Sequence, residues 1–139
     1  MKKVNNIIQV VKKSYELLAD DFHSYFNERF QQSTIRFSFS GASSMSYDQS
    51  VLNNFIDRCI YYRLGISDVK PQRSDIIYDL SSTIAPEEFE PNVDSIFAEL
   101  VYCAYPVKLI TKFKHQLEAH KVDPKAIELI VSKLEIDTN

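Results

Sequence analysis

Apolar side chains recur along the first thirty residues at the spacing of one helix face. From Val4 to Tyr25 they follow one another at alternating intervals of four and three positions, which is the repeat of a stripe along an α-helix. Phe26 and Phe30 continue and widen this stripe. The pattern predicts a helix over residues 3–31, which would extend over roughly 40 Å at 1.5 Å per residue.

The pattern changes between residues 32 and 45, a segment rich in serine. Ile35, Phe37 and Phe39 alternate here with polar residues, as in a strand with one buried face. A single strand needs a partner, and residues 76–80 are the candidate. We expect an extended loop with buried phenylalanines; a short hairpin between the two segments is the alternative.

The next helix has a start signal and a stop signal. Ser46 and Gln49 form a capping box, and the apolar positions that follow repeat with helical spacing, with Arg63 on the same face. Gly65 is placed to end the helix in a left-handed conformation, and Ile66 is placed for the apolar contact that accompanies such an end.

The second half of the chain predicts further helices punctuated by prolines. Proline suits the first position of a helix and interrupts a helix interior. The expected elements are a short helix after Ser74, a helical turn from Pro86, a buried central helix over residues 92–105 that Pro106 ends, a helix from about Leu109 to Lys121, and a last helix with Asp123 as cap and Pro124 in its first turn. The expected fold class is all-α: a single-domain irregular bundle of about five to six helices over residues 1–139.

Composition supports one helical domain. Of the 139 residues, 45% are hydrophobic, whereas two are glycine and five are proline. A chain of this size buries roughly 68% of its unfolded surface, and so few turn-forming residues argue against a β fold and against disorder.

Cys59 and Cys103 form no CxxC pair, which favours a reducing compartment, so we expect a cytoplasmic protein. We expect neither a signal peptide nor a membrane partner, because no apolar stretch is long enough.

Several catalytic and nucleotide-binding motifs are excluded by the glycine content. Gly41 and Gly65 are the only glycines, so neither a phosphate-binding loop nor the GxSxG elbow of a serine hydrolase can be written. Cys59 and Cys103 lie among apolar neighbours and are expected to be buried, unreactive thiols. We therefore expect no enzyme and no cofactor.

Two pairs of residues place a carboxylate one helical turn from an imidazole: Asp20 with His23, and His115 with Glu118. Both pairs lie away from the apolar faces of their helices, so we expect them to face solvent and predict no metal site. The alternative is a metal-dependent or histidine-based enzyme or sensor that uses His23, His115 or His120.

The last part of the chain has a weak cationic stripe. Lys108, Lys112 and His115 share one outward face, but residues 107–139 have a net charge of only +1 and contain no arginine. Because binding to a phosphate backbone needs a denser positive surface, we expect no nucleic-acid partner.

The strongest charge asymmetry lies in the middle of the chain. Residues 71–106 hold one basic residue against seven acidic ones, a net charge of −6, with aromatic residues interleaved. Such a surface suits the capture of a basic protein by long-range attraction and aromatic anchors; the alternative is that these carboxylates stabilise helix starts. The residues expected to bind the partner are Asp75, Tyr78, Asp79, Glu87, Glu88, Phe89, Glu90 and Asp94.

These features favour a protein–protein interaction module. The form we expect is an inhibitor of the immunity or antitoxin type, which neutralises a basic, toxin- or nuclease-like partner through residues 75–99. A further alternative is a structural or adaptor protein that forms a homodimer through the aromatic stripe of the first helix, around Tyr15, Phe22 and Phe26.

Overall fold

The computed structural model describes residues 2–37, 49–80 and 86–135, with the backbone alone described for residues 2–6, 31–37, 79–80 and 86–92. Within these ranges the chain forms helices and no strand, so the predicted all-α class is confirmed. The helices are α1 (Lys2–Phe37), α2 (Gln49–Leu64), α3 (Arg73–Leu80), α4 (Pro86–Val101), α5 (Val107–Ala119) and α6 (Pro124–Ser132).

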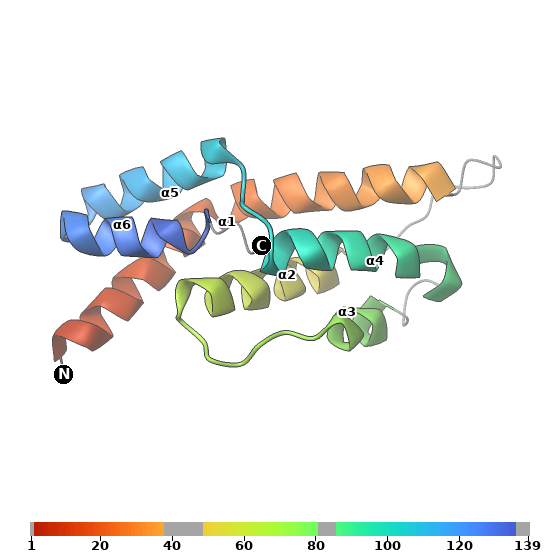
Figure 1. Ribbon diagram of the computed structural model, residues 1–139, viewed down its shortest axis with the longest axis horizontal. Helices are drawn as coiled ribbons and strands as arrows, with labels where there is room; N and C mark the ends of the chain where they lie inside the picture. The colour runs from red at the N-terminus through yellow and green to blue at the C-terminus, as the bar shows by residue number, and fades with distance from the viewer. Residues whose placement is uncertain (1, 38–48, 81–85, 136–139) are drawn as a thin grey trace.

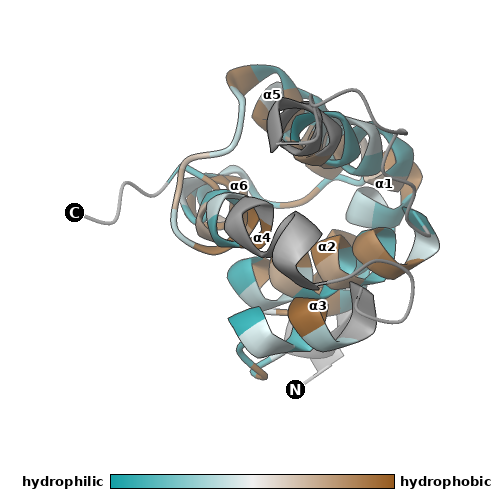
Figure 2. Ribbon diagram, turned by 90° about the vertical axis from the view of Figure 1, so that its right-hand side faces the viewer, coloured by the Kyte–Doolittle hydropathy of each residue, from teal (hydrophilic) through white to brown (hydrophobic). Residues whose placement is uncertain are grey.

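The long helix α1 organises the bundle. It runs along the molecule and packs on α2, α4 and α5 (Figure 1). Helices α2 and α4 pack on each other and on α3, which lies on the side of the bundle away from α5 (Figure 2). Helix α6 packs against α5, so the last two helices form a hairpin at one end of the molecule. All six helices contribute buried apolar side chains to one core.

Helix α1 is longer than the sequence predicts. It continues to Phe37, so the expectation of an extended loop is wrong for residues 32–37, and residues 38–45 lie outside the described residues. Once a helix has formed, each further residue adds a hydrogen bond without the cost of a new nucleus, so a short alternation of apolar residues does not stop it. The alternative hairpin is excluded, because its partner segment, residues 76–80, belongs to α3.

Helix α4 joins two elements that the sequence predicts as separate, the helical turn from Pro86 and the central helix over residues 92–105. It begins at Pro86, continues through Pro91 and ends at Val101, four residues before the predicted end at Tyr105. Pro86 stands at the first position of the helix, where an amide has no partner within the helix. Pro91, five residues further on, removes one intrahelical hydrogen bond, and the helix continues through it. Helix α5 then begins at once after Pro106, which occupies its N-cap position.

Two predicted helix ends are confirmed. Gly65 has a φ of 80°, and the amides of Gly65 and Ile66 donate to carbonyls of the last turn of α2 over 3.2 and 2.9 Å, which is the hydrogen-bond pattern of a Schellman motif. Asp123 caps α6, since its side chain accepts a hydrogen bond from the amide of Lys125 at 3.1 Å. The capping box at Ser46 lies outside the described residues.

Arg63 is buried where α2, α4 and α6 meet. Its guanidinium group donates hydrogen bonds to the carbonyl oxygens of Cys103 and Lys133, both at 2.6 Å, and lies 4.5 Å from the centre of the Tyr105 ring. These carbonyls follow the ends of α4 and α6, where helical amides no longer supply donors. Arg63 therefore joins the ends of three helices and fixes the position of α6.

Candidate functional site

The described carboxylates of the predicted acidic surface make local contacts. Asp75 accepts a hydrogen bond at 2.9 Å from a backbone amide just before α3 and so stabilises the start of that helix. Asp94 forms an ion pair with Arg73. Glu99 accepts two hydrogen bonds from Arg29 of α1, one of them at 2.7 Å. These groups serve the fold, and their charge is partly neutralised within the chain.

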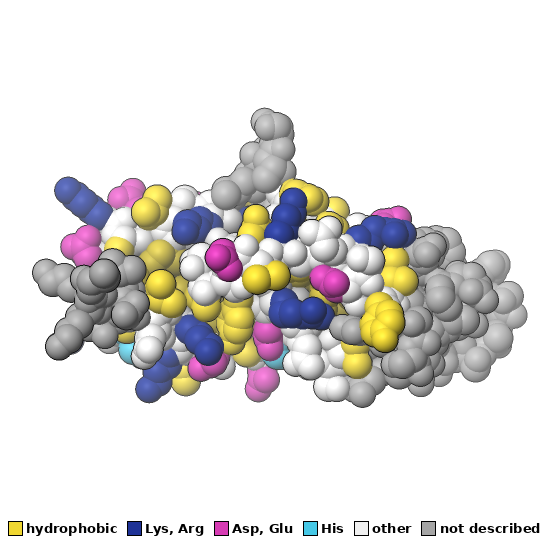
Figure 3. Space-filling model, turned by 90° about the horizontal axis from the view of Figure 1, so that it is seen from below, with side chains coloured by type: hydrophobic (Ala, Val, Ile, Leu, Met, Phe, Trp, Pro, Cys, Tyr) yellow, Lys and Arg dark blue, Asp and Glu magenta, His cyan; other side chains and the backbone are white. Residues whose placement is uncertain are grey.

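The aromatic part of that surface is divided between solvent and core. Tyr78 is 80% exposed on α3, whereas Phe97 is half-buried, with its ring centre 6.2 Å from that of Phe55. In the described part of the face that contains α3, basic and acidic side chains are interspersed and form no continuous acidic field (Figure 3). The side chains of the remaining predicted residues lie outside the described residues: Asp79, Glu87, Glu88, Phe89 and Glu90.

His23 was expected to face solvent, and this expectation is wrong. Its imidazole lies half-buried between α1 and α2, with Nε2 2.7 Å from an oxygen of Asp57. The same oxygen accepts a hydrogen bond from the hydroxyl group of Tyr15 at 2.6 Å. Asn27, one turn further along α1, is buried and donates to the side-chain oxygen of Asn53 at 2.6 Å. The expectation failed because α1 is covered by α2 along this stripe as well as by α4 and α5 along its apolar face.

The side chains of this polar cluster between α1 and α2 are buried or half-buried and are satisfied by hydrogen bonds. Burial, together with the hydrogen bond to Asp57, raises the pKa of Tyr15 well above its usual range, so its phenol stays protonated and donates. Among the described residues every buried side-chain nitrogen or oxygen has a hydrogen-bond partner. A shallow polar groove of about 530 Å³ lies beside the cluster and is lined by Asp20, His23, Ser24, Asn27, Glu28, Gln49 and Asn53. The arrangement is that of a structural clamp between two helices.

The other two histidines lie apart from this cluster. His115 and Glu118 are exposed, as predicted. His120 is half-buried at the end of α5, where its Nδ1 lies 2.8 Å from the carbonyl oxygen of Gln116 and 3.4 Å from the hydroxyl of Ser14. In the part of the chain that the structure describes, no three potential metal ligands gather in one place.

The two cysteines differ in exposure. Cys59 is buried, and its burial raises the pKa of the thiol to about 12. Cys103 is exposed, so the prediction that both thiols are buried is wrong for this residue. The reason is that α4 ends at Val101, which places Cys103 in the turn that follows.

The cationic stripe of α5 is partly neutralised. Lys108, Lys112 and His115 are all exposed, but the Nζ atom of Lys112 lies 3.2 Å from a carboxylate oxygen of Asp21 on α1. This ion pair reduces the charge that the stripe offers to a phosphate backbone.

The aromatic stripe of α1 belongs to the core of its own chain. Tyr15, Phe22, Phe26 and Phe30 are all buried, and Phe26 lies edge-on to Tyr105, with ring centres 5.4 Å apart. Because these side chains are buried within their own chain, they are not exposed to a second molecule in this fold. The alternative of a homodimer through the first helix stays a prediction.

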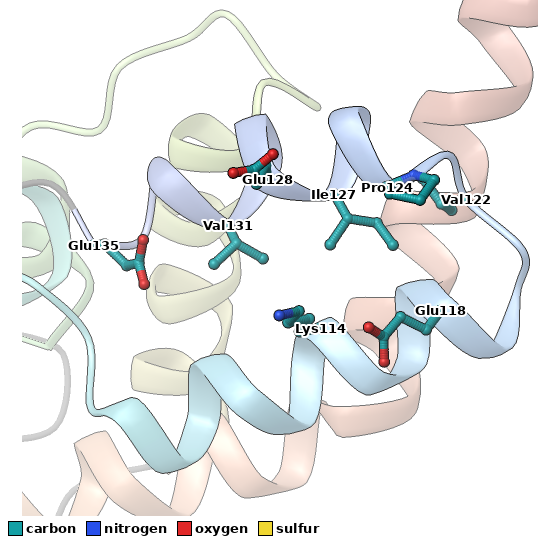
Figure 4. A pocket seen from close by; sticks show the side chains of 8 residues that line it. All are labelled: Lys114, Glu118, Val122, Pro124, Ile127, Glu128, Val131 and Glu135. Carbon is teal, nitrogen blue, oxygen red and sulfur yellow. The ribbon is translucent and has the colours of Figure 1, made fainter.

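Helices α5 and α6 enclose a groove with apolar walls. Its volume is about 630 Å³. Figure 4 shows Ile127 and Val131 pointing from α6 toward α5, while Lys114 points from α5 into the space between the helices. An adjoining hollow of about 400 Å³ shares Lys114 and Val131 with it and adds Val107 and Ile110. We call these two connected hollows the α5–α6 groove.

Charged side chains surround this groove. Glu118, Glu128 and Glu135 line it together with Lys114, and all four are exposed. Within the described residues none of them takes part in an ion pair. The groove thus combines an acidic rim with an apolar floor in which Ile127 and Val131 are only 4% and 7% exposed. Sequence reasoning missed it because the apolar face of α6 has the pattern of any core-facing helix.

The fold and this site define a class: an all-α bundle with an open amphipathic groove between its last two helices. None of the helices in the described ranges is both long and apolar enough to cross a membrane. Comparisons with known proteins add no assignment, since no protein-family model, curated protein or solved structure gives a significant match to the chain.

Proposed function

We propose that the protein is an interaction module whose α5–α6 groove binds an amphipathic, positively charged segment of another protein. The observation that supports this best is the combination of an apolar floor with an acidic rim in a groove of about 630 Å³. Soluble proteins usually expose apolar side chains singly, whereas a continuous apolar hollow with a polar rim is typical of binding sites.

The apolar floor would supply the binding energy. A helical segment entering the groove would place apolar side chains against Val107, Val122 and Pro124, apolar lining residues that are not already buried, and displace water from them. The groove exposes little apolar surface, so covering roughly 150 Å² of it contributes on the order of 4 kcal/mol, and the loss of rotational and translational freedom offsets part of this. We expect a weak affinity for a single segment, on the order of millimolar.

The rim would select the charge of the partner. Three glutamates oppose one lysine around the groove, so its net charge is −2. Lysine or arginine residues that flank the apolar positions of a partner would be attracted, and acidic residues would be repelled. The proposed partner is basic, as the sequence predicts. We place its main contact at α5 and α6 and not at residues 75–99, because Asp75, Asp94 and Glu99 make contacts within the chain; the predicted contacts of the remaining residues there stay predictions.

An inhibitor of the immunity or antitoxin type is the finer form of this proposal. A toxin- or nuclease-like protein carries the positive surface that such a groove would attract, and the acidic segment 71–106, with its net charge of −6, would add long-range attraction. Asp79, Glu87, Glu88, Phe89 and Glu90 stay predicted additional contacts.

Binding can be tested with a designed probe. The probe is a short, fluorescein-labelled model helix of leucine and lysine, with leucine at helical spacing, measured by fluorescence anisotropy. One control has the same composition in scrambled order, and the other replaces lysine by glutamate. We expect the leucine–lysine helix to bind at least about tenfold more tightly than either control, and more weakly at high salt.

Charge reversal at the rim locates the binding site. Glu128→Lys combined with Glu135→Lys should weaken the leucine–lysine helix by at least about tenfold. The matched control, Asp20→Lys with Glu28→Lys, makes the same change in net charge at exposed positions of α1 outside the groove. Equal weakening in both variants, or equal binding of the ordered and scrambled probes, would refute the proposal.

A further inference from the structure

The apolar stripe of α1 continues beyond the core of its own chain. Val11 and Tyr15 are buried, whereas Ile7 and Ile8, one turn nearer the N-terminus, are 42% and 36% exposed. Figure 1 shows these first turns of α1 extending past the ends of α2 and α4. Two large apolar side chains that continue the core-facing pattern are thus open to solvent, as expected for a surface that another molecule covers.

This exposed end is strongly basic. Residues 2–13 of α1 contain four lysines and no acidic residue, a net charge of +4. The end of α1 is therefore a positively charged, amphipathic helix, which is the chemistry that suits the α5–α6 groove with its net charge of −2.

The exposed end also lies beside the groove of its own chain. Ile7 and Val10 line a hollow of about 170 Å³ together with residues 120–123, the turn between α5 and α6. Val122 lines both this hollow and the α5–α6 groove. The end of α1 cannot enter the groove of its own chain, because a straight helix cannot fold back on itself. A twofold axis near Val122 would instead bring the end of α1 of each copy to the groove of the other copy. Such an arrangement is a closed, reciprocal dimer.

We propose that in the free protein the N-terminal end of α1 from a second copy occupies the α5–α6 groove. This inference rests on the proposed function, because it uses the same groove, and it adds a regulation: the second copy and a partner compete for one site. Direct pairing of α1 with α1 is disfavoured, because it would bring eight lysines together without a carboxylate in residues 2–13 to compensate them.

Sedimentation velocity of the full chain over a range of concentrations tests the apolar contact. We expect a dimer that Ile8→Glu weakens by at least about tenfold, because a charge then enters an apolar contact. Leu17→Glu is the matched control: Leu17 is an exposed apolar residue of the same helix, 59% exposed, that lies off the stripe. The control should dimerise like the wild type, and circular dichroism should show that both variants are folded.

Exchange of charges tests the identity of the two surfaces. Replacement of Lys2, Lys3, Lys12 and Lys13 by glutamate reverses the net charge of the end of α1 from +4 to −4, and Glu128→Lys with Glu135→Lys reverses that of the rim from −2 to +2. Each charge-reversed variant alone should be a monomer, and an equimolar mixture should form a heterodimer, because both reciprocal contacts then join opposite charges. A wild type that stays monomeric, a rim variant that dimerises normally, or a mixture that does not associate would overturn the inference.

The leucine–lysine helix separates this inference from the proposed function. It should bind Ile8→Glu more tightly than the wild type, because the groove of that variant is vacant. If the wild type is monomeric but its groove binds the helix, occupancy by a second copy is wrong and the proposed function stands. If the helix does not bind even to Ile8→Glu, the proposed function is wrong as well.

Discussion

Two pairs of helices in this protein arrange polar and apolar side chains in opposite ways. Between α1 and α2, the polar side chains of Tyr15, His23 and Asn27 are buried or half-buried, and each has a partner on α2. Between α5 and α6, the exposed Val107 and the nearly buried Ile127 and Val131 line an open groove, and the charged groups around it make no ion pair within the described residues.

The difference separates a structural interface from a surface available for binding. Enclosed polar groups are costly to expose or to leave without a partner, so the contact of α1 with α2 is maintained. Apolar side chains that stay exposed along a groove, such as Val107, gain free energy when another molecule covers them. The part of the fold with unburied apolar surface is therefore where we place the function, and the polar cluster with its histidine is where we place stability.

The difference between the buried core and the open groove should appear most strongly in the rates at which the two cysteines react. Cys103 is exposed, next to Ala104 of the groove, whereas Cys59 of α2 is buried. We expect one thiol to react rapidly with Ellman's reagent in the native protein. Cys59 should react only when the core opens, which costs on the order of 5 kcal/mol or more. Mass spectrometry identifies the labelled residue, and rapid labelling of both cysteines would show that the core around α2 is not closed.

Removal of Asp57 should have the next largest effect. Asp57→Ala leaves the buried hydroxyl of Tyr15 and the imidazole of His23 without their acceptor, so we expect a loss of about 2–4 kcal/mol in the free energy of unfolding. Urea denaturation followed by circular dichroism measures it. The control Glu128→Ala, at the groove rim, should change stability by less than about 0.5 kcal/mol. Similar values for the two variants would remove the distinction between the regions.

Features that depend on neighbouring residues in the chain could be predicted from the sequence. The spacing of apolar residues located the helices, and Gly65 and Asp123 marked helix ends because a left-handed residue and a capping carboxylate act within one turn. The end of α1 was misplaced because the alternation of Ile35 and Phe37 is too short to distinguish a strand from a helix.

Features that depend on distant residues could not be predicted. His23 and Asp57 are 34 positions apart, and a helical wheel shows which face of α1 is apolar without showing that α2 covers a second one. The same limit applies to the groove: the spacing of Ile127 and Val131 identifies an apolar face, but whether a neighbour covers it depends on how α6 is held, in part by Arg63.

Alkaline pH should weaken the closed side of the molecule. The pKa of Tyr15 is raised by burial and by Asp57, while in the unfolded chain it is about 10. Below pH 10 both states keep the proton. Above it the unfolded state loses the proton first, so stability falls by up to about 1.4 kcal/mol per pH unit for this group. Urea midpoints measured between about pH 8 and pH 11 should fall less steeply in Tyr15→Phe; an unchanged slope would contradict this account.

The smallest effect on stability is expected in the groove itself, where binding and folding can be separated. Val107 is exposed at the start of α5 and lines the groove, so Val107→Ser should change the free energy of unfolding by less than about 0.5 kcal/mol. Its affinity for the leucine–lysine helix should fall about fivefold, because roughly 1 kcal/mol of apolar burial is lost on binding.

Leu129→Ser is the matched control, since Leu129 is an exposed apolar residue of α6 that does not line the groove. Equal losses of affinity in the two variants would mean that the probe adheres to exposed apolar side chains in general. A loss confined to Val107→Ser would mean that the open region binds while contributing little to the stability of the fold.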